Sequence, residues 1–188
     1  MSLFTQLMSP SLNEDYQYQI IAIDGNCASG KTTLAKQIQS HYPNSAILHI
    51  DDFFLPKNQR KATWLEDIAG NIDLRTIKDL LNQYQKDHFI AYQPFDCHQQ
   101  AYKEGITIDH PSFLIVEGSY AFHPSLIDAY DLKIFLTCNE NKQLLRLGLR
   151  QDDLQSFKDI WIKKEQTYFT TYSIKEKADL IFDTSALF

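Results

Sequence analysis

The chain has 188 residues and a formal net charge of −6 at pH 7, with 44% hydrophobic and 22% charged residues. This length suits one domain with an apolar core, and a hydrophobic content near the globular norm excludes a largely disordered chain. An acidic chain with only 4 arginines also excludes a broad binding face for nucleic acid.

The sequence gives no signal for export or membrane insertion. Its first residues lack a basic segment and an apolar stretch, and no run approaches the roughly 18 apolar residues of a membrane span. Cys27, Cys97 and Cys138 are too few and too widely spaced to predict a disulfide framework or a zinc cluster. We therefore expect a cytoplasmic protein with no membrane partner, and we leave open whether it forms a homo-oligomer.

Apolar runs and helical periodicity divide the chain into alternating elements. Residues 1–17 resemble a polar leader, and one domain follows over residues 18–188. Strands are predicted at 18–23, 46–50, 113–116, 132–136 and 178–182, and helices at 32–42, 74–84, 141–150 and 156–169, with residues 55–71 irregular. The alternation predicts an α/β fold with a five-stranded parallel sheet, helices on both of its faces and a small helical lid at about residues 141–155.

Acidic and glycine residues follow three of the predicted strands. Asp24-Gly25, Asp51-Asp52 and Glu117-Gly118 stand at the ends of the first, second and third strands. In parallel sheets, ligands bind beyond the carboxyl ends of the strands. The sequence therefore predicts a site at this edge of the sheet.

Residues 25–32 satisfy the phosphate-binding pattern G-x-x-x-x-G-K-[ST] in full, between a predicted strand and a predicted helix. The glycines let backbone N–H groups turn inward around phosphates, and the helix N-terminus adds its positive dipole end. Lys31 would reach the β- and γ-phosphates, and the Thr32 hydroxyl would hold Mg²⁺. The predicted nucleotide-binding residues are Gly25, Asn26, Cys27, Ala28, Ser29, Gly30, Lys31, Thr32 and Thr33.

Three classes of nucleotide-binding protein use such a loop. A GTPase switch is disfavoured because the chain has no Asn-Lys-x-Asp run, and an ATPase motor because 188 residues leave no room for a partner domain. A kinase needs a group that accepts the substrate's hydroxyl proton and cations that cover the transferring phosphoryl group. Both kinds of group can be found in this chain.

Two acidic and two basic residues are candidates for these roles. Asp51 could accept the hydroxyl proton or help to hold Mg²⁺, and Glu117 would orient metal-bound water. Arg146 and Arg150 are four residues apart, so a helix places them on one face. Their planar guanidinium groups suit the spread charge of a phosphoryl group.

These motifs together resemble the uridine kinase family of P-loop kinases, which is related to nicotinamide riboside kinase and phosphoribulokinase. The resemblance is carried by residues 25–33, by Asp51-Asp52-Phe53-Phe54, by Glu117-Gly118 and by the two arginines. The aromatic motif after the second strand is more distinctive of that family than the phosphate loop is.

The resemblance implies a P-loop NTPase fold and a role for several residues. Asp51 would be the base that acts on the 5′-hydroxyl of the substrate, and Phe54 would lie near the nucleobase. Asp73, at the start of the next helix, would hold the ribose hydroxyls. The residues expected to be catalytic are Asp51, Lys31, Arg146 and Arg150, and those expected to hold metal are Thr32, Asp51 and Glu117.

The segment that reads the base departs from the family pattern. Uridine kinases usually carry a Tyr, an Asp and a Phe followed by a His, whereas this chain has Phe95, Asp96, Cys97 and, in place of the His, Gln100. A site that reads a base by hydrogen bonds changes its preference when its donors change. Tyr92, Phe95 and Asp96 are still expected to contact the substrate.

The sequence therefore predicts a kinase that uses ATP and Mg²⁺ to phosphorylate the 5′-hydroxyl of a nucleoside. One alternative is a kinase for nicotinamide riboside, pantothenate or another small alcohol. Another is an ATP-binding regulatory protein without phosphotransfer. The sequence does not choose between ATP and GTP as donor.

Overall fold

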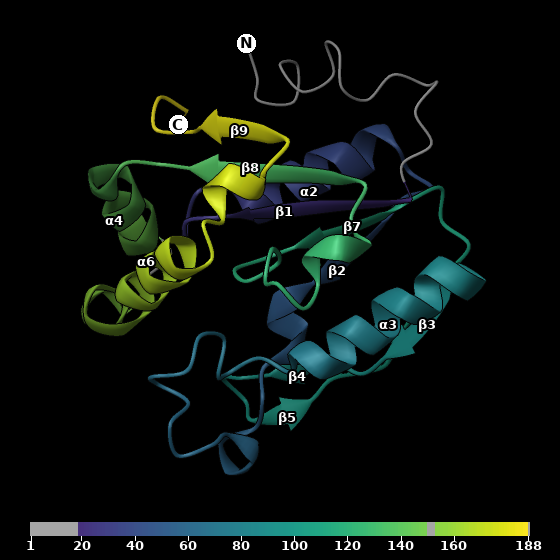
Figure 1. The fold of residues 1–188 in the computed structure, drawn as a ribbon, viewed down its shortest axis with the longest axis horizontal. Coiled ribbons are helices and arrows are strands. Elements are labelled where there is room, and N and C mark those ends of the chain that lie inside the picture. Colours follow the sequence, from purple (N-terminus) through teal and green to yellow (C-terminus); the bar gives the residue numbers. More distant parts are fainter. Residues whose placement is uncertain (1–18, 150–152, 188) are drawn as a thin grey trace.

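A computed structural model describes residues 19–149 and 153–187, and its centre is a parallel sheet of five strands (Figure 1). In spatial order the strands are β2 (Ala46–His49), β7 (Leu114–Glu117), β1 (Ile20–Gly25), β8 (Leu132–Thr137) and β9 (Leu180–Asp183). The predicted fold class is confirmed. The predicted leader, Arg150 and part of the predicted lid lie outside the described residues.

The helices cover both faces of the sheet and its carboxyl edge. They are α2 (Lys31–His41), α3 (Leu74–Asp87), α4 (Glu140–Leu149), α5 (Leu154–Ser156) and α6 (Ile162–Thr171), with a π-helical turn at Phe157–Trp161. Figure 1 shows α4 and α6 beyond the ends of β8 and β9. Among the described residues, no helix is both long and apolar enough to cross a membrane.

The core is divided by the sheet into two apolar layers, because successive side chains of a strand point to opposite faces. Ile20 and Ala22 of β1 belong to the larger layer, with Ile77, Leu81 and Tyr84 of α3. Ile21 and Ile23 of β1 belong to the second layer, which α2 covers with Leu34, Ala35 and Ile38. The β1 strand is fully buried as a result, as its continuous apolar sequence predicts.

Two short hairpin-like pairs lie outside the main sheet, and the sequence analysis did not predict them. The antiparallel pairs are β3 (Phe89–Tyr92) with β6 (Ile106–Asp109), and β4 (Phe95–Asp96) with β5 (Ala101–Tyr102). Short 3-10 turns complete the described elements at Ile50–Phe53, Lys57–Gln59, Ile127–Ala129 and Lys175–Lys177. The pairs lie on the same side of the molecule as α3 (Figure 1).

Gly25 ends β1 at a point where two strands nearly touch. Its φ is +140°, and a Cβ built on it would stand 1.9 Å from the carbonyl oxygen of Leu136 in β8. The next residue, Asn26, donates its backbone N–H to that same oxygen at 3.1 Å. Only glycine allows this approach, which fixes where the chain leaves the sheet.

A buried carboxylate lies directly before that glycine. Asp24 is fully buried and accepts hydrogen bonds from the backbone N–H of Gly25, the backbone N–H of Phe122 and the hydroxyl of Tyr168. Burial raises the pKa of Asp24 from 3.8 to about 6, although these three bonds and the charge of Lys31 oppose the shift. Asp24 thereby connects β1 with the segment after β7 and with α6.

We predict that Gly25→Ala strongly destabilises the protein. The added methyl group meets backbone atoms that cannot move aside, and the positive φ adds strain, so we expect a loss of about 3 kcal/mol in the free energy of unfolding. The control is Gly148→Ala in α4, where the nearest atom to the added Cβ is a Leu154 methyl carbon at 3.8 Å. That change should stabilise the protein by about 0.5–1 kcal/mol. Equal urea midpoints for the two variants would contradict the prediction.

We also predict that Asp24 makes the protein less stable as the pH rises from about 4 to 6. The folded state holds the Asp24 proton more tightly than the unfolded chain, so deprotonation over this range favours unfolding. The rise in pKa from 3.8 to about 6 corresponds to about 3 kcal/mol at 1.36 kcal/mol per pH unit.

The test compares urea unfolding of the wild type with that of Asp24→Asn at a series of pH values. The free energy of unfolding of the wild type, minus that of the variant, should fall by this amount between pH 4 and pH 6.5. Asp128→Asn, which removes an exposed carboxylate, controls for the change in net charge. A difference that stays constant or grows with pH would show that the pKa of Asp24 is not raised.

Candidate functional site

The phosphate-binding pattern forms a turn between β1 and α2. Within it, Ser29 donates its backbone N–H to the carbonyl of Asn26 at 3.1 Å, and Ala28 and Gly30 have φ values of +57° and +99°. Gly30 is the N-cap of α2 and supplies no side-chain acceptor, and the first turn of α2 contains no acidic residue. The N-terminal amides and the positive end of the helix dipole are therefore available to an anion.

Lys31 is held inside this turn. Its side chain is buried, and its Nζ donates to the carbonyl oxygens of Gly25 and Asn26, each at 2.8 Å. Both acceptors are neutral, so the positive charge is not cancelled by a carboxylate in direct contact. The charge acts on its surroundings: it opposes the rise in the pKa of Asp51 and helps to hold the pKa of Glu117 below its ordinary value.

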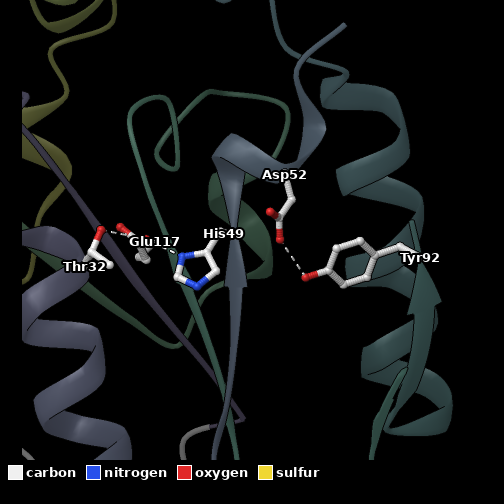
Figure 2. A network of polar contacts seen from close by, with 5 residues as sticks. All are labelled: Thr32, His49, Asp52, Tyr92 and Glu117. Carbon is white, nitrogen blue, oxygen red and sulfur yellow. Dashed lines mark hydrogen bonds and ion pairs between the residues drawn. The ribbon is translucent and has the colours of Figure 1, made fainter. Parts of the chain in front are cut away.

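Glu117, at the end of β7, joins two neighbouring elements (Figure 2). Its Oε1 accepts a hydrogen bond from the Thr32 hydroxyl at 3.0 Å and contacts Nδ1 of His49. His49 and Glu117 are register partners in the parallel pair of β2 and β7. Burial disfavours the charged form of Glu117, but His49, Lys31 and Thr32 outweigh it and hold its pKa below the ordinary value. The same hydrogen bond raises the pKa of His49 above its ordinary value.

Asp51 lies two residues beyond His49, in the 3-10 turn that follows β2. It lines the pocket and remains accessible to water. The crowding of protein atoms around the carboxyl group removes part of its hydration, and this desolvation, followed by the negative charge of Glu117, raises its pKa. Lys31 and His49 act in the opposite direction. An accessible carboxylate with a raised pKa is suited to accepting a proton.

The adjacent Asp52 has a different partner. Figure 2 shows its carboxylate facing Tyr92, whose hydroxyl donates to Oδ2 at 3.1 Å. The Tyr92 ring also packs against Phe53, with ring centroids 5.0 Å apart. Asp51 and Asp52 thus have different surroundings, and only Asp51 lines the pocket.

One pocket of about 520 Å³ brings most of the predicted site together. It extends from the phosphate-binding turn, past the ends of β2 and β7, to residues 54–60 and 97–100. The predicted site residues that line it are residues 27, 28 and 30–33 of the turn, with Asp51, Phe54 and Glu117. The remaining turn residues, Gly25, Asn26 and Ser29, do not line it.

Four residues that were expected to contact the substrate have other partners in this structure. Asp73 caps α3 and accepts hydrogen bonds from the N–H and the hydroxyl of Thr76. Tyr92 is bonded to Asp52, as described above, and Phe95 is buried. Asp96 accepts the N–H groups of His98 and Gln99 and pairs with Lys103 at 3.3 Å. The pocket is lined instead by neighbouring residues of the same segment: Cys97, His98 and Gln100.

The guanidinium group of Arg146 lies against the backbone rather than in the pocket lining. It donates to the carbonyl oxygens of Ala28, Thr184 and Leu187 and to the Thr184 hydroxyl, at 2.6–3.1 Å. That hydroxyl in turn donates to the carbonyl of Ser29 at 2.9 Å. The C-terminal segment is therefore fastened to the phosphate-binding turn. The predicted role of Arg146 at a phosphoryl group stays a prediction, and Arg150 lies outside the described residues.

Glu165 of α6 is a pocket residue that the sequence analysis missed. It is buried and accepts the backbone N–H of Cys27 at 2.9 Å and the hydroxyl of Ser119 at 3.0 Å. Burial raises its pKa, and together burial and Glu165 raise the pKa of the Cys27 thiol to about 12. Cys27 is therefore a neutral thiol that packs in the turn, and α6 is anchored directly to the turn.

The donor set at the end of the sheet suits a hard cation. Thr32, Asp51 and Glu117 offer oxygen atoms, which Mg²⁺ prefers, and Mg²⁺ commonly uses one or two carboxylates together with phosphates and water. Within the described part of the chain, no group of three His, Cys, Asp or Glu residues could hold a metal by itself. Thr32, Asp51 and Glu117 therefore fit a Mg²⁺ ion whose remaining ligands are phosphate oxygens and water.

Comparison with curated proteins identifies kinases as relatives, although no family model matches the chain. Nicotinamide riboside kinase 2 of Mus musculus is 32% identical over 127 residues, or 63% of this chain and 60% of the relative. The uridine kinase of Macrococcus caseolyticus is 28% identical over 142 residues, or 70% of this chain and 68% of the relative. The match thus spans about three fifths of the first relative and about two thirds of the second.

Solved structures share the fold over nearly the whole chain. A possible uridine kinase from Bacillus stearothermophilus superposes with a TM-score of 0.73 over 96% of this chain and 95% of its own, at 19% identity. Phosphoribulokinase from Rhodobacter spheroides gives a TM-score of 0.63 over 89% of this chain and 70% of its own, at 11% identity. By sequence the chain is a distant homologue of nicotinamide riboside kinase and uridine kinase, and it shares the fold of the possible uridine kinase and of phosphoribulokinase.

Proposed function

We propose that this protein is a small-molecule kinase that transfers the γ-phosphoryl group of ATP to the 5′-hydroxyl of a nucleoside or related riboside. The observation that carries the proposal is the position of Asp51. An accessible carboxylate with a raised pKa lines the same pocket as the phosphate-binding turn. A protein that only binds nucleotide has no need of such a proton acceptor beside the phosphates.

The turn and Lys31 would bind and orient the triphosphate. Backbone N–H groups at the start of α2 and the Lys31 ammonium group offer positive charge without a neutralising carboxylate in contact. Because they are fixed before the ligand arrives, little reorganisation is needed as charge develops on the transferring group. Mg²⁺ held by Thr32, Asp51 and Glu117 would neutralise further phosphate charge.

Asp51 would activate the acceptor. The acceptor oxygen forms a bond to the γ-phosphorus as the bond from that phosphorus to the bridging oxygen of ADP breaks, and the hydroxyl proton passes to Asp51. ADP leaves with the electron pair of the broken bond. Desolvation and Glu117 make Asp51 a stronger base, while Lys31 and His49 favour its ionised form.

The relatives support a riboside acceptor. Both nicotinamide riboside kinase and uridine kinase are named for ribosides, and their sequences match this chain at 28–32% identity. The segment that would face a base contains Cys97, His98 and Gln100, all of which line the pocket. A panel of uridine, cytidine, nicotinamide riboside and pantothenate, assayed by release of ADP, would identify the acceptor. Stimulation by pantothenate alone would favour another small alcohol, and tight ATP binding without stimulation would favour a regulatory protein.

We predict that Asp51→Asn abolishes turnover and spares ATP binding. Loss of a general base typically costs about 10²–10⁴-fold in rate, whereas the phosphate-binding turn is unchanged. Steady-state release of ADP measures the first effect, and calorimetric titration with ATP measures the second. Asp52→Asn is the matched control, since Asp52 is bonded to Tyr92 outside the pocket lining. Wild-type turnover in Asp51→Asn would refute the assignment.

A further inference from the structure

The residues that follow Asp51 are joined to the start of α3. Two backbone hydrogen bonds, at 2.8 and 2.9 Å, connect residues 53–55 with residues 71–73 around an antiparallel bridge. Phe54 and Asn71, one from each side of this bridge, line the pocket. Asp51 stands directly before the bridged pair, so we expect a shift of the pair to be felt at the proposed base.

The loop between the two bridged segments packs around Trp64. The guanidinium carbon of Arg60 lies 4.8 Å from the centroid of the Trp64 ring, and Nε of Arg60 donates to the carbonyl of Leu55 at 2.9 Å. Near the other end of the loop, a Cβ built on Gly70 would stand 2.6 Å from the carbonyl oxygen of Trp64. Trp64 therefore contacts residues close to both ends of the loop, next to the bridged pair.

Helix α6 holds this loop through Lys164. Its Nζ donates to three backbone carbonyl oxygens, those of Trp64, Leu65 and Asp67, at 3.1, 2.7 and 2.8 Å. An ammonium group has three N–H donors, so these carbonyls satisfy all of them. The centroid of the Trp161 ring, three residues earlier, lies 6.2 Å from that of the Trp64 ring. The loop is thus fastened to α6 by hydrogen bonds and by an aromatic contact.

The same face of the helix reaches the phosphate-binding turn. Glu165, which follows Lys164, accepts the backbone N–H of Cys27 at 2.9 Å. Residues three and four apart are neighbours on a helix surface, so Lys164 and Glu165 lie beside Trp161. Trp161 and Glu165 line the pocket, whereas Lys164 does not. Lys164 therefore acts on a reaction in the pocket through the residues that it holds.

We propose that Lys164 is a positioning residue for phosphoryl transfer. By fastening residues 64–67 to α6, it sets the distance between the segment that carries Asp51 and Phe54 and the turn that binds the phosphates. This inference rests on the proposed kinase function and gives a role in it to a residue outside the pocket lining. It adds no step to the transfer: the proton still passes to Asp51 and ADP is still the leaving group.

Lys164→Met tests this role, because methionine keeps the apolar stem of the side chain and removes all three donors. A displacement of about 1 Å between reacting groups can cost about 10²-fold in rate. We expect kcat with the accepted riboside, measured by release of ADP, to fall about tenfold to a hundredfold, with an unchanged Kd of ATP. The matched control is Lys163→Met on the same helix, where the lysine is exposed and the change should alter neither value.

The two tryptophans of the chain give a second readout. Both lie in this contact, so Trp161→Phe leaves Trp64 as the one fluorescent tryptophan. In that background, Lys164→Met should shift the Trp64 emission to longer wavelength and increase its quenching by acrylamide, because the loop leaves α6. Lys164→Arg, which keeps a charged donor, should restore the emission and most of the lost kcat.

Trp64→Leu weakens the same contact from the side of the loop. It removes the ring that packs against Trp161 and Arg60 but keeps the carbonyl that Lys164 binds. The kcat should therefore fall in the same direction and by less than in Lys164→Met. Calorimetric titration with ATP shows for each variant whether the phosphate-binding turn is intact, and Trp64→Leu decides the question if Lys164→Met does not fold.

Three results would overturn the inference and leave the kinase function intact. Wild-type kcat in Lys164→Met together with a shifted Trp64 emission would show that the loop can leave α6 without consequence for the transfer. An unchanged emission would show that Lys164 does not hold the loop. A parallel rise in the Kd of ATP would assign the loss of kcat to a general disruption of the fold. Failure of every acceptor of the earlier panel to stimulate release of ADP from the wild type would remove the kinase function itself, and the role of Lys164 with it.

Discussion

The geometry of the site depends on one buried carboxylate. Asp24 has no contact with water, and its oxygens accept donors from Gly25, from Phe122 and from Tyr168. A charge in such surroundings is tolerated only when hydrogen bonds replace its hydration, so the three donors must stay in place together. Asp24 thus fixes the start of the phosphate-binding turn relative to α6 and to the segment after β7.

The parallel sheet then brings distant residues together. Since β1 lies between β7 and β8, the turn that follows it faces the ends of both neighbours. The register of β2 and β7 sets His49 against Glu117, and the Thr32 hydroxyl reaches Glu117 from α2. Glu165 completes the arrangement from α6, 138 residues away from its partner Cys27. Each contact crosses between elements that the sequence separates widely.

This separation explains what could be predicted from the sequence. The five strands and the main helices were predicted because continuous apolar runs and helical periodicity are local properties. The pairs formed by β3 to β6 were missed because β4 and β5 have only two residues each and β6 is mostly exposed. His49 carried a weak signal, as a polar residue in an apolar strand two positions before Asp51. Glu165 carried no signal in the sequence, because its hydrogen-bond partners, Cys27 and Ser119, lie in other parts of the fold.

Arg146 is a further residue whose contacts could not be predicted from the sequence. The spacing of Arg146 and Arg150 places both on one helix face, but periodicity does not say what that face meets. In the folded chain Arg146 meets the carbonyl oxygens of Ala28, Thr184 and Leu187. A guanidinium group suits such backbone acceptors as well as it suits a phosphoryl group, so its chemistry alone could not distinguish the two.

The positive groups in the pocket must also offset the negative charge that a nucleotide would bring. Desolvation and Glu117 already raise the pKa of Asp51. A triphosphate bound in the phosphate-binding turn would add negative charge nearby, and without opposing cations this charge would favour protonated Asp51, which could not serve as the proposed base. Lys31 and His49 oppose this at the phosphate end.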